Sequence, residues 1–344
     1  MSQSVLKASS NANLPAWFYN LLDGHVSLEE GSVSKLKNQD FILKDGILRA
    51  QELVSQKQKQ TEETFGFKWK KRETFEGKAN LKRMADWLTE RYGPAAALPA
   101  GDHPVILDAG CGAAMSAYCY FDQLLETGKF VGADISEAVD VALERGQTVS
   151  GEKAFLQCDL NSLPFKKESF DIIFSEGVLH HTDNTEKAFK SLVPLLKPGG
   201  IIMIYVYRKK GPIREYTDDY IRMQLQNISP QEAWDKMIPL TKLGQLLGEL
   251  DIEIDVPENI DLLEIPAGKI NLQRLFYWHV MKMYYRDDMT LDEMNHINYD
   301  WYTPANAHRH TLEEVQGWYQ ECGLKIIRQN EQEAGLTLIG QKSA

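Results

Sequence analysis

The sequence of 344 residues has little cysteine and no long hydrophobic run. Its four cysteines form no Cys-x-x-Cys pair, so neither a zinc knuckle nor a disulfide framework is indicated, and we expect no metal site. No window reaches the roughly 18 apolar residues that a membrane span needs. The first residues also lack the apolar segment of a signal peptide. These absences favour a cytoplasmic protein that does not bind membranes.

Positive charge is scarce relative to negative charge. The chain has 38 Lys and Arg against 49 Asp and Glu, and a formal net charge of −11 at pH 7. Non-specific binding of nucleic acid depends on neutralising phosphates, so this balance predicts no nucleic-acid partner. A hydrophobic content of 43% is ordinary and sufficient for a core. The sequence leaves a homodimer open.

Apolar runs alternate with helical stretches in residues 101–207. Continuous apolar runs are typical of strands that are buried on both faces. Strands that alternate with helices through short links predict an α/β fold with a parallel, doubly wound sheet. The five predicted strands are "PVILDAG", "KFVGAD", "KAFLQCDL", "SFDIIFS" and "GGIIMIYVY".

Three other segments flank or follow this core. Residues 1–100 are predicted as an N-terminal extension with a helical arm, and "FILKDGILRA" within it carries a hairpin signal at Asp45-Gly46. Residues 208–305 are predicted as a mostly helical insertion. Residues 306–344 contain a last helix and then two strands with no helix between them, so the sheet must reverse direction once. Three helix starts in these segments carry capping patterns, at Ser229, Thr290 and Thr311.

The stretch "VILDAGCGAAM" places glycines directly after the first predicted strand. A dinucleotide fingerprint needs a third Gly or Ala, and Met115 stands there instead. Asp108 would also repel a pyrophosphate. The loop therefore favours a ligand that needs close backbone at Gly110 and Gly112 and that carries positive charge or hydroxyl groups.

S-adenosylmethionine is such a ligand, because it has an ammonium and a sulfonium but no phosphate. Asp134, at the end of the second strand, would accept hydrogen bonds from its ribose hydroxyls. Asp159, after the third strand, would accept from the adenine amino group. Ligands bind at this carboxyl edge of such sheets. The alternative is that Asp134 and Asp159 only cap the helices that follow them.

In these motifs the chain resembles the class I S-adenosylmethionine-dependent methyltransferases, specifically their small-molecule branch. The blocks are "LDAGCGA", "VGADIS", "QCDLNSLPF", "ESFDIIFSEGVLHHTDN" and "LKPGG". The resemblance implies a Rossmann-like, seven-stranded sheet, mostly parallel with an antiparallel last strand, and a helical insertion after strand five. It also implies a set of cofactor-binding residues, namely Asp108, Gly110, Gly112, Asp134, Ile135, Ser136, Asp159, Leu160, Ser175 and Glu176.

The densest polar and aromatic stretch, "NYDWYTPANAHRHT" at 298–311, is expected to face a substrate. His308 or His310 would act as general base, and Arg309 would pair with a substrate anion. The alternative for His310 is packing against a helix N-terminus. Tyr207, at the end of the fifth strand, would reach the pocket as a further catalytic candidate. The predicted substrate-binding residues are Tyr299, Trp301, Tyr302, Arg309 and His181, although His181 also fits a purely structural role.

In "TFGFKWK", Phe65, Phe67 and Trp69 alternate and would share one face of an extended segment. This segment would either form a lid with an aromatic ring near the sulfonium or simply pack as an N-terminal arm. The predicted activity is methyl transfer from S-adenosylmethionine to a small metabolite by in-line displacement. The alternatives are an RNA or protein methyltransferase and a non-catalytic protein that binds S-adenosylmethionine.

Overall fold

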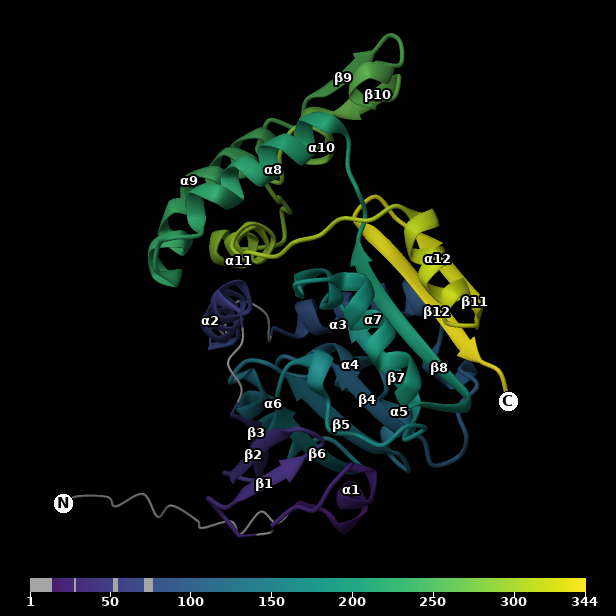
Figure 1. The fold of residues 1–344 in the computed structure, drawn as a ribbon. Coiled ribbons are helices and arrows are strands. Elements are labelled where there is room, and N and C mark those ends of the chain that lie inside the picture. Colours follow the sequence, from purple (N-terminus) through teal and green to yellow (C-terminus); the bar gives the residue numbers. More distant parts are fainter. Residues whose placement is uncertain (1–13, 28, 52–54, 71–76) are drawn as a thin grey trace, which may run out of the picture.

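The computed structural model describes residues 14–27, 29–51, 55–70 and 77–344. Within these residues ten strands form one sheet, in the order β1-β2-β3-β6-β5-β4-β7-β8-β12-β11 (Figure 1). The five pairings from β3 to β8 are parallel. The other pairings in this sheet are antiparallel. The chain therefore has a mixed α/β fold around a large sheet that is parallel at its centre.

The central strands are the apolar runs predicted from the sequence. On β4, Ile106 and Leu107 are fully buried in two different hydrophobic clusters, as expected for a strand covered on both faces. The elements of this region are β4 (Val105–Ala109), α4 (Met115–Tyr120), α5 (Asp122–Leu125), β5 (Lys129–Asp134), α6 (Ala138–Gly146), β6 (Glu152–Gln157), β7 (Phe170–Glu176), α7 (Thr185–Leu192) and β8 (Leu196–Tyr207).

The predicted reversal of the sheet is present at its C-terminal edge. Helix α12 (Leu312–Glu321) leads into β11 (Leu324–Glu331), and β12 (Gly335–Lys342) follows after a short turn. Strand β12 lies between β8 and β11 and is antiparallel to both. Helix α12 begins after Thr311, whose side chain forms a capping box with Glu314.

The predicted count of seven strands is wrong, because three N-terminal strands extend the sheet beyond β6. They are β1 (Val33–Leu36), β2 (Gln39–Lys44) and β3 (Ile47–Ala50). The hairpin signal is real, since Asp45 and Gly46 have φ angles of 53° and 75° at the β2–β3 turn. Strand β3 then pairs in parallel with β6. The sequence pattern does not reveal this pairing, because it depends on contacts far apart in the chain.

Three helices complete the N-terminal segment, namely α1 (Ala16–Leu21), α2 (Gln56–Lys70) and α3 (Lys78–Tyr92). Phe65 and Phe67 belong to α2, so the expected extended segment is a helix. Their side chains accordingly have different partners: Phe65 contacts His181, and Phe67 contacts Trp234 and Tyr299. The side chain of Trp69 lies outside the described residues.

Residues 208–305, which we call the cap, follow β8 and lie beyond the sheet at the end to which β8 runs (Figure 1). The cap also contacts the N-terminal segment, because α2 packs against α9 and α11. An irregular segment at 281–286 joins α10 to α11. The elements of the cap are α8 (Pro212–Leu225), α9 (Pro230–Glu249), β9 (Glu253–Val256), β10 (Gly268–Asn271), α10 (Leu272–His279) and α11 (Leu291–Tyr302).

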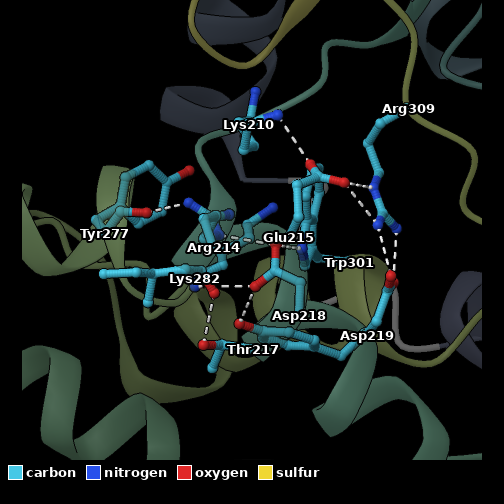
Figure 2. A network of polar contacts seen from close by, with 12 residues as sticks. Lys210, Arg214, Glu215, Thr217, Asp218, Asp219, Tyr277, Lys282, Trp301 and Arg309 are labelled. Atoms are coloured by element: carbon cyan, nitrogen blue, oxygen red, sulfur yellow. Dashed lines mark hydrogen bonds and ion pairs between the residues drawn. The ribbon is translucent and has the colours of Figure 1, made fainter. Parts of the chain in front are cut away.

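The buried carboxylate of Asp218 connects two helices of the cap, α8 and α11 (Figure 2). Asp218 on α8 pairs with Arg214 one turn earlier at 2.7 Å. Its oxygens also accept hydrogen bonds from Trp301 Nε1 at 2.7 Å and from the Tyr302 hydroxyl at 2.8 Å. The Asp218 side chain is only 2% exposed, so these donors replace its lost hydration. One group thereby fixes α8 against α11.

We predict that Asp218→Ala lowers the free energy of unfolding by about 3–5 kcal/mol, because it leaves the buried Arg214 guanidinium without its counter-charge. Asp219→Ala is the matched control. Asp219 also pairs with arginines, but its side chain is 54% exposed, so its loss should cost about 0–1 kcal/mol. Chemical denaturation measures both values. Equal losses in the two variants would contradict this account of the cap.

Candidate functional site

A cavity of about 1280 Å³ lies between the carboxyl edge of the central strands and the cap. Ligand pockets usually have volumes of about 300–1,000 Å³, so this cavity has room for more than one small ligand. Its walls come from the turns after β4, β5, β6 and β7 on one side and from α2, α3, α8, α10 and α11 on the other.

The turn after β4 brings bare backbone to the cavity. Gly110 has a φ angle of 89°, which L side chains rarely adopt. A Cβ atom at this position would lie 2.1 Å from Val178 Cγ1. Gly110 N–H donates to the Ala133 carbonyl at 2.7 Å, which fixes the turn against β5. Both Gly110 and Gly112 line the cavity.

Asp134, at the end of β5, holds this turn in place. Its Oδ2 accepts from Gly112 N–H at 2.8 Å, and its Oδ1 accepts from the N–H and the hydroxyl of Ser136 at 2.8 and 2.7 Å. Burial raises the pKa of Asp134, while the bonds from Ser136 and Gly112 oppose this effect. Asp134 and Ile135 line the cavity, whereas Ser136 supports Asp134 from outside it.

Asp108 is the buried carboxyl group that matches a cationic ligand. It is 3% exposed and lines the cavity. Burial, together with repulsion from Asp134 and Glu176, raises its pKa well above the usual range. An ammonium or sulfonium beside Asp108 would offset this cost. This carboxyl group and the glycines that line the same cavity fit S-adenosylmethionine.

Asp159 and Leu160 line the cavity after β6. Asp159 Oδ1 accepts from the backbone N–H and the side-chain amide of Asn161 at 2.8 and 2.9 Å, so it also caps the short helix Leu160–Ser162. The two interpretations of Asp159 are therefore compatible, because one oxygen caps the helix while the residue borders the cavity.

Glu176, at the end of β7, lines the cavity, and two residues of α3 hold its carboxylate in place. It forms an ion pair with Arg91 and accepts from the Tyr92 hydroxyl. The Arg91 guanidinium lies 3.6 Å from the ring centroids of both Trp87 and Tyr205, an arrangement that stabilises a buried cation. Ser175, also predicted as cofactor-binding, does not border the cavity. Its hydroxyl donates to the Ala109 carbonyl at 2.7 Å.

Three of the predicted acceptor-side residues, His181, Tyr207 and Trp301, also line the cavity. The Tyr207 ring lies 4.2 Å from that of Trp301. Burial raises the pKa of Tyr207 well above its usual range, so its hydroxyl stays protonated and can donate a hydrogen bond but cannot act as a base. His181 Nδ1 donates to the Asn306 carbonyl at 2.6 Å.

The proposed bases His308 and His310 lie away from this cavity, and the structure gives them other partners. His308 Nε2 contacts the Thr182 carbonyl at 3.1 Å, and His310 Nε2 contacts the Thr185 hydroxyl at 3.0 Å. Both line a separate surface pocket beside α7 and α12. The His310 ring sits next to the start of α12 (Leu312–Glu321), in line with the alternative packing role. We therefore assign neither residue a catalytic role.

Three predicted substrate-binding residues also lie outside the cavity lining. Arg309 is saturated by Glu215 and Asp219 at 2.8 Å each. Tyr299 and Tyr302 are fully buried within the cap. Their neighbours on α11 line the cavity instead, at positions three and four residues apart, namely Glu293, His296, Ile297, Asp300 and Trp301. Applied to the sequence of α11, the helical period of 3.6 residues would have separated the buried face, which holds Tyr299 and Tyr302, from the face that lines the cavity.

Two residues that were not predicted complete the acceptor-side wall. Asp300 on α11 forms an ion pair with Lys68 on α2. Attraction by Lys68, His181 and Lys282 outweighs burial and lowers the pKa of Asp300 to about 2, so this carboxylate is charged.

The described residues contain no cluster of three potential metal ligands. None of the described helices combines the length and the apolar character needed to cross a membrane.

Comparison with known proteins identifies the segment that carries the glycine turn. Residues 107–204 match the family described as "Methyltransferase domain". The chain is 36% identical over 118 residues to a tRNA (carboxymethyluridine(34)-5-O)-methyltransferase of Arabidopsis thaliana. These aligned residues make up 32% of this chain and 25% of that protein. It is 28% identical over 136 residues to phosphoethanolamine N-methyltransferase 1 of the same plant, covering 39% and 27%.

Among solved structures, the chain is similar to the 1,6-didemethyltoxoflavin-N1-methyltransferase of Burkholderia thailandensis, with 12% identity and a TM-score of 0.44, over 90% of this chain and 97% of that one. The matched segment at 107–204 is the domain of an S-adenosylmethionine-dependent methyltransferase, and S-adenosylmethionine is its cofactor. The chain spans about a quarter of the length of the two curated relatives. Their names differ in substrate, so they select no substrate class.

We predict that Asp134→Ala weakens binding of S-adenosylhomocysteine about 10- to 100-fold. The variant loses a charged acceptor for the ribose and the bond that holds Gly112, and hydrogen bonds to charged groups contribute about 1.5–3 kcal/mol. Asp140→Ala is the control, because Asp140 is half-exposed and pairs with Arg49 at the surface. Isothermal titration calorimetry measures the affinities. An unchanged affinity in Asp134→Ala would remove this residue from the cofactor site.

Proposed function

We propose that this chain transfers a methyl group from S-adenosylmethionine to a small metabolite held between the central domain and the cap. One observation carries the proposal: a single cavity joins the cofactor-binding turns to a second wall of aromatic and polar side chains. That wall includes Tyr207, Trp301 and Asp300. Trp301 and Asp300 belong to the cap, whereas Tyr207 ends β8, and a cavity lined in this way suits a small molecule. The net charge of −11 disfavours a polynucleotide acceptor.

S-adenosylmethionine supplies a methyl group already activated by its positive sulfur. The remaining work of the protein is to align the acceptor with that methyl group, exclude water and take up any proton that the acceptor loses. The aromatic side chains of Tyr207 and Trp301 supply an apolar wall for the acceptor, and the Tyr207 hydroxyl is a hydrogen-bond donor toward it.

His181 is the residue that we propose as hydrogen-bond acceptor for the reacting group. Because Nδ1 donates to the Asn306 carbonyl, Nε2 of the neutral ring carries no proton. Nε2 makes no hydrogen bond within the described part of the chain, and His181 lines the cavity. Phe65 packs against the ring at 5.2 Å between centroids, which holds its orientation.

The main test uses donor carrying a labelled methyl group in a cell extract. We expect the label to appear in metabolites that pass an ultrafiltration membrane, with Asp134→Ala as the inactive control. Label that enters RNA or protein instead would support the second candidate, a macromolecular methyltransferase, which the name of the tRNA methyltransferase relative favours. Binding of S-adenosylhomocysteine without any transfer would support a non-catalytic binding protein.

We further predict that His181→Ala lowers kcat about 100-fold or more when the acceptor must lose a proton, with little change in affinity for S-adenosylhomocysteine. The matched controls His308→Ala and His310→Ala should retain turnover, because both residues lie outside the cavity. The extract fraction that accepts the label serves as substrate. Loss of turnover in a control, or full activity in His181→Ala, would contradict the assignment.

The pH profile gives a separate expectation for His181. Burial lowers the pKa of its ring to about 4, so the ring is neutral and able to accept a proton throughout pH 6–9. Turnover should therefore show no fall with a midpoint near pH 6.5, the ordinary value of imidazole, as the pH decreases from 8 to 6. A fall with that midpoint that disappears in His181→Gln would show that the ring is solvated and ordinary.

A further inference from the structure

Two cations of the cap meet over one aromatic ring at the cavity wall (Figure 2). The Lys282 ammonium, from the irregular segment 281–286, lies 4.6 Å from the ring centroid of Trp301. The Arg214 guanidinium, from α8, lies 5.3 Å from the same ring. Lys282 is 8% exposed and Arg214 is 1% exposed. Both line the cavity, so they reach it from different elements of the cap.

The carboxylates near these two cations are already engaged. Asp218 is shared by Arg214 and by donors on α11, and it does not border the cavity. Asp300 does border the cavity, but it forms its ion pair with Lys68. The Lys282 ammonium makes no hydrogen bond or ion pair within the described part of the chain. Each of these two carboxylates therefore already has a cationic partner other than Lys282.

Arg214 has limited remaining capacity for hydrogen bonds. Its Nε donates to Asp218 at 2.7 Å, and its Nη1 donates to the Tyr277 carbonyl. Its Nη2 donates to no group in the described part of the chain. The guanidinium is therefore held rigid by two bonds while one nitrogen stays available, the arrangement of a preorganised anion contact.

Burial of Lys282 carries a cost that a bound anion would offset. Desolvation lowers the pKa of Lys282 to about 7. Repulsion from Arg214 and Lys68 contributes to this lowering, and attraction by Asp300 and Asp218 opposes it. An unpaired buried ammonium is unfavourable, and an additional negative group within hydrogen-bonding distance would stabilise its charged form.

We propose that Lys282 and Arg214 bind an anionic group of the methyl acceptor, a carboxylate or a phosphate. This inference rests on the proposed function, because it assigns a chemical class to the substrate of the same cavity. The wall near Asp108, Asp134 and Asp159 carries acidic side chains, whereas this part of the cap carries basic ones. An acceptor with a negative group at one end would therefore be oriented with its other end toward the methyl donor.

The test titrates inorganic phosphate, and separately acetate, into the protein saturated with S-adenosylhomocysteine. Calorimetry should detect saturable binding of at least one anion in the unmodified protein and at least a tenfold loss of affinity in Lys282→Met. Lys209→Met is the matched control, because Lys209 is exposed and lies outside the cavity lining. Lys282→Arg should retain binding. Phosphate binding alone indicates a phosphorylated acceptor, and binding of both anions admits a carboxylate.

Three outcomes would overturn the proposal: no binding of either anion, equal binding in Lys282→Met and Lys209→Met, or binding of the anion to the protein without S-adenosylhomocysteine that is lost once S-adenosylhomocysteine is bound. The last outcome would assign the cations to the cofactor's own carboxylate. The affinity of each variant for S-adenosylhomocysteine is measured first. If the unmodified protein does not bind S-adenosylhomocysteine, the proposed function itself is rejected. If it binds S-adenosylhomocysteine but no anion, only this inference is rejected.

Discussion

The acceptor half of the cavity depends on the buried carboxylate of Asp218. It takes hydrogen bonds from Trp301 and Tyr302, two adjacent residues of α11, and pairs with Arg214 on α8. Since both α11 donors point at one group, the rotation of α11 about its axis is fixed relative to α8. The same rotation places Asp300 on the cavity wall. A buried charge is costly unless its hydrogen bonds are satisfied, so the helices have little freedom to rearrange.

The cofactor half obeys a different constraint, the parallel order of the central strands. Strands β4, β5 and β6 are neighbours in the sheet and run in the same direction. Their carboxyl ends therefore meet at one edge and bring together Asp108, Asp134 and Asp159. Each side chain is positioned by its own strand, with local hydrogen bonds such as that from Gly112 to Asp134. Burial and the neighbouring carboxylates of Asp134 and Glu176 disfavour the charged form of Asp108, and a cation bound beside them would relieve this repulsion.

This difference explains what the sequence could predict. The strand ends can be located from apolar runs, so most of the predicted cofactor residues border the cavity, and Ser136 and Ser175 support it from behind. The acceptor residues depend on which face of a cap helix is turned inward. The stretch at 298–311 contributes to the wall through Asp300 and Trp301, but its histidines turn toward α7 and α12. No local pattern marks that division where the chain leaves α11.

The position of Lys68 and Lys282 at the cavity could not be predicted from the sequence, for a stronger reason. They are more than 200 residues apart, and each becomes a cavity residue only through the position of Asp300 and Trp301 between them. The match to the methyltransferase domain ends at residue 204, before Tyr207 and before the whole cap. Similarity confined to that segment constrains the cofactor half and leaves the acceptor half undetermined. Relatives named for a tRNA and for phosphoethanolamine can therefore resemble this chain to a similar extent, and the acceptor has to be inferred from the charges and aromatic rings of the cap itself.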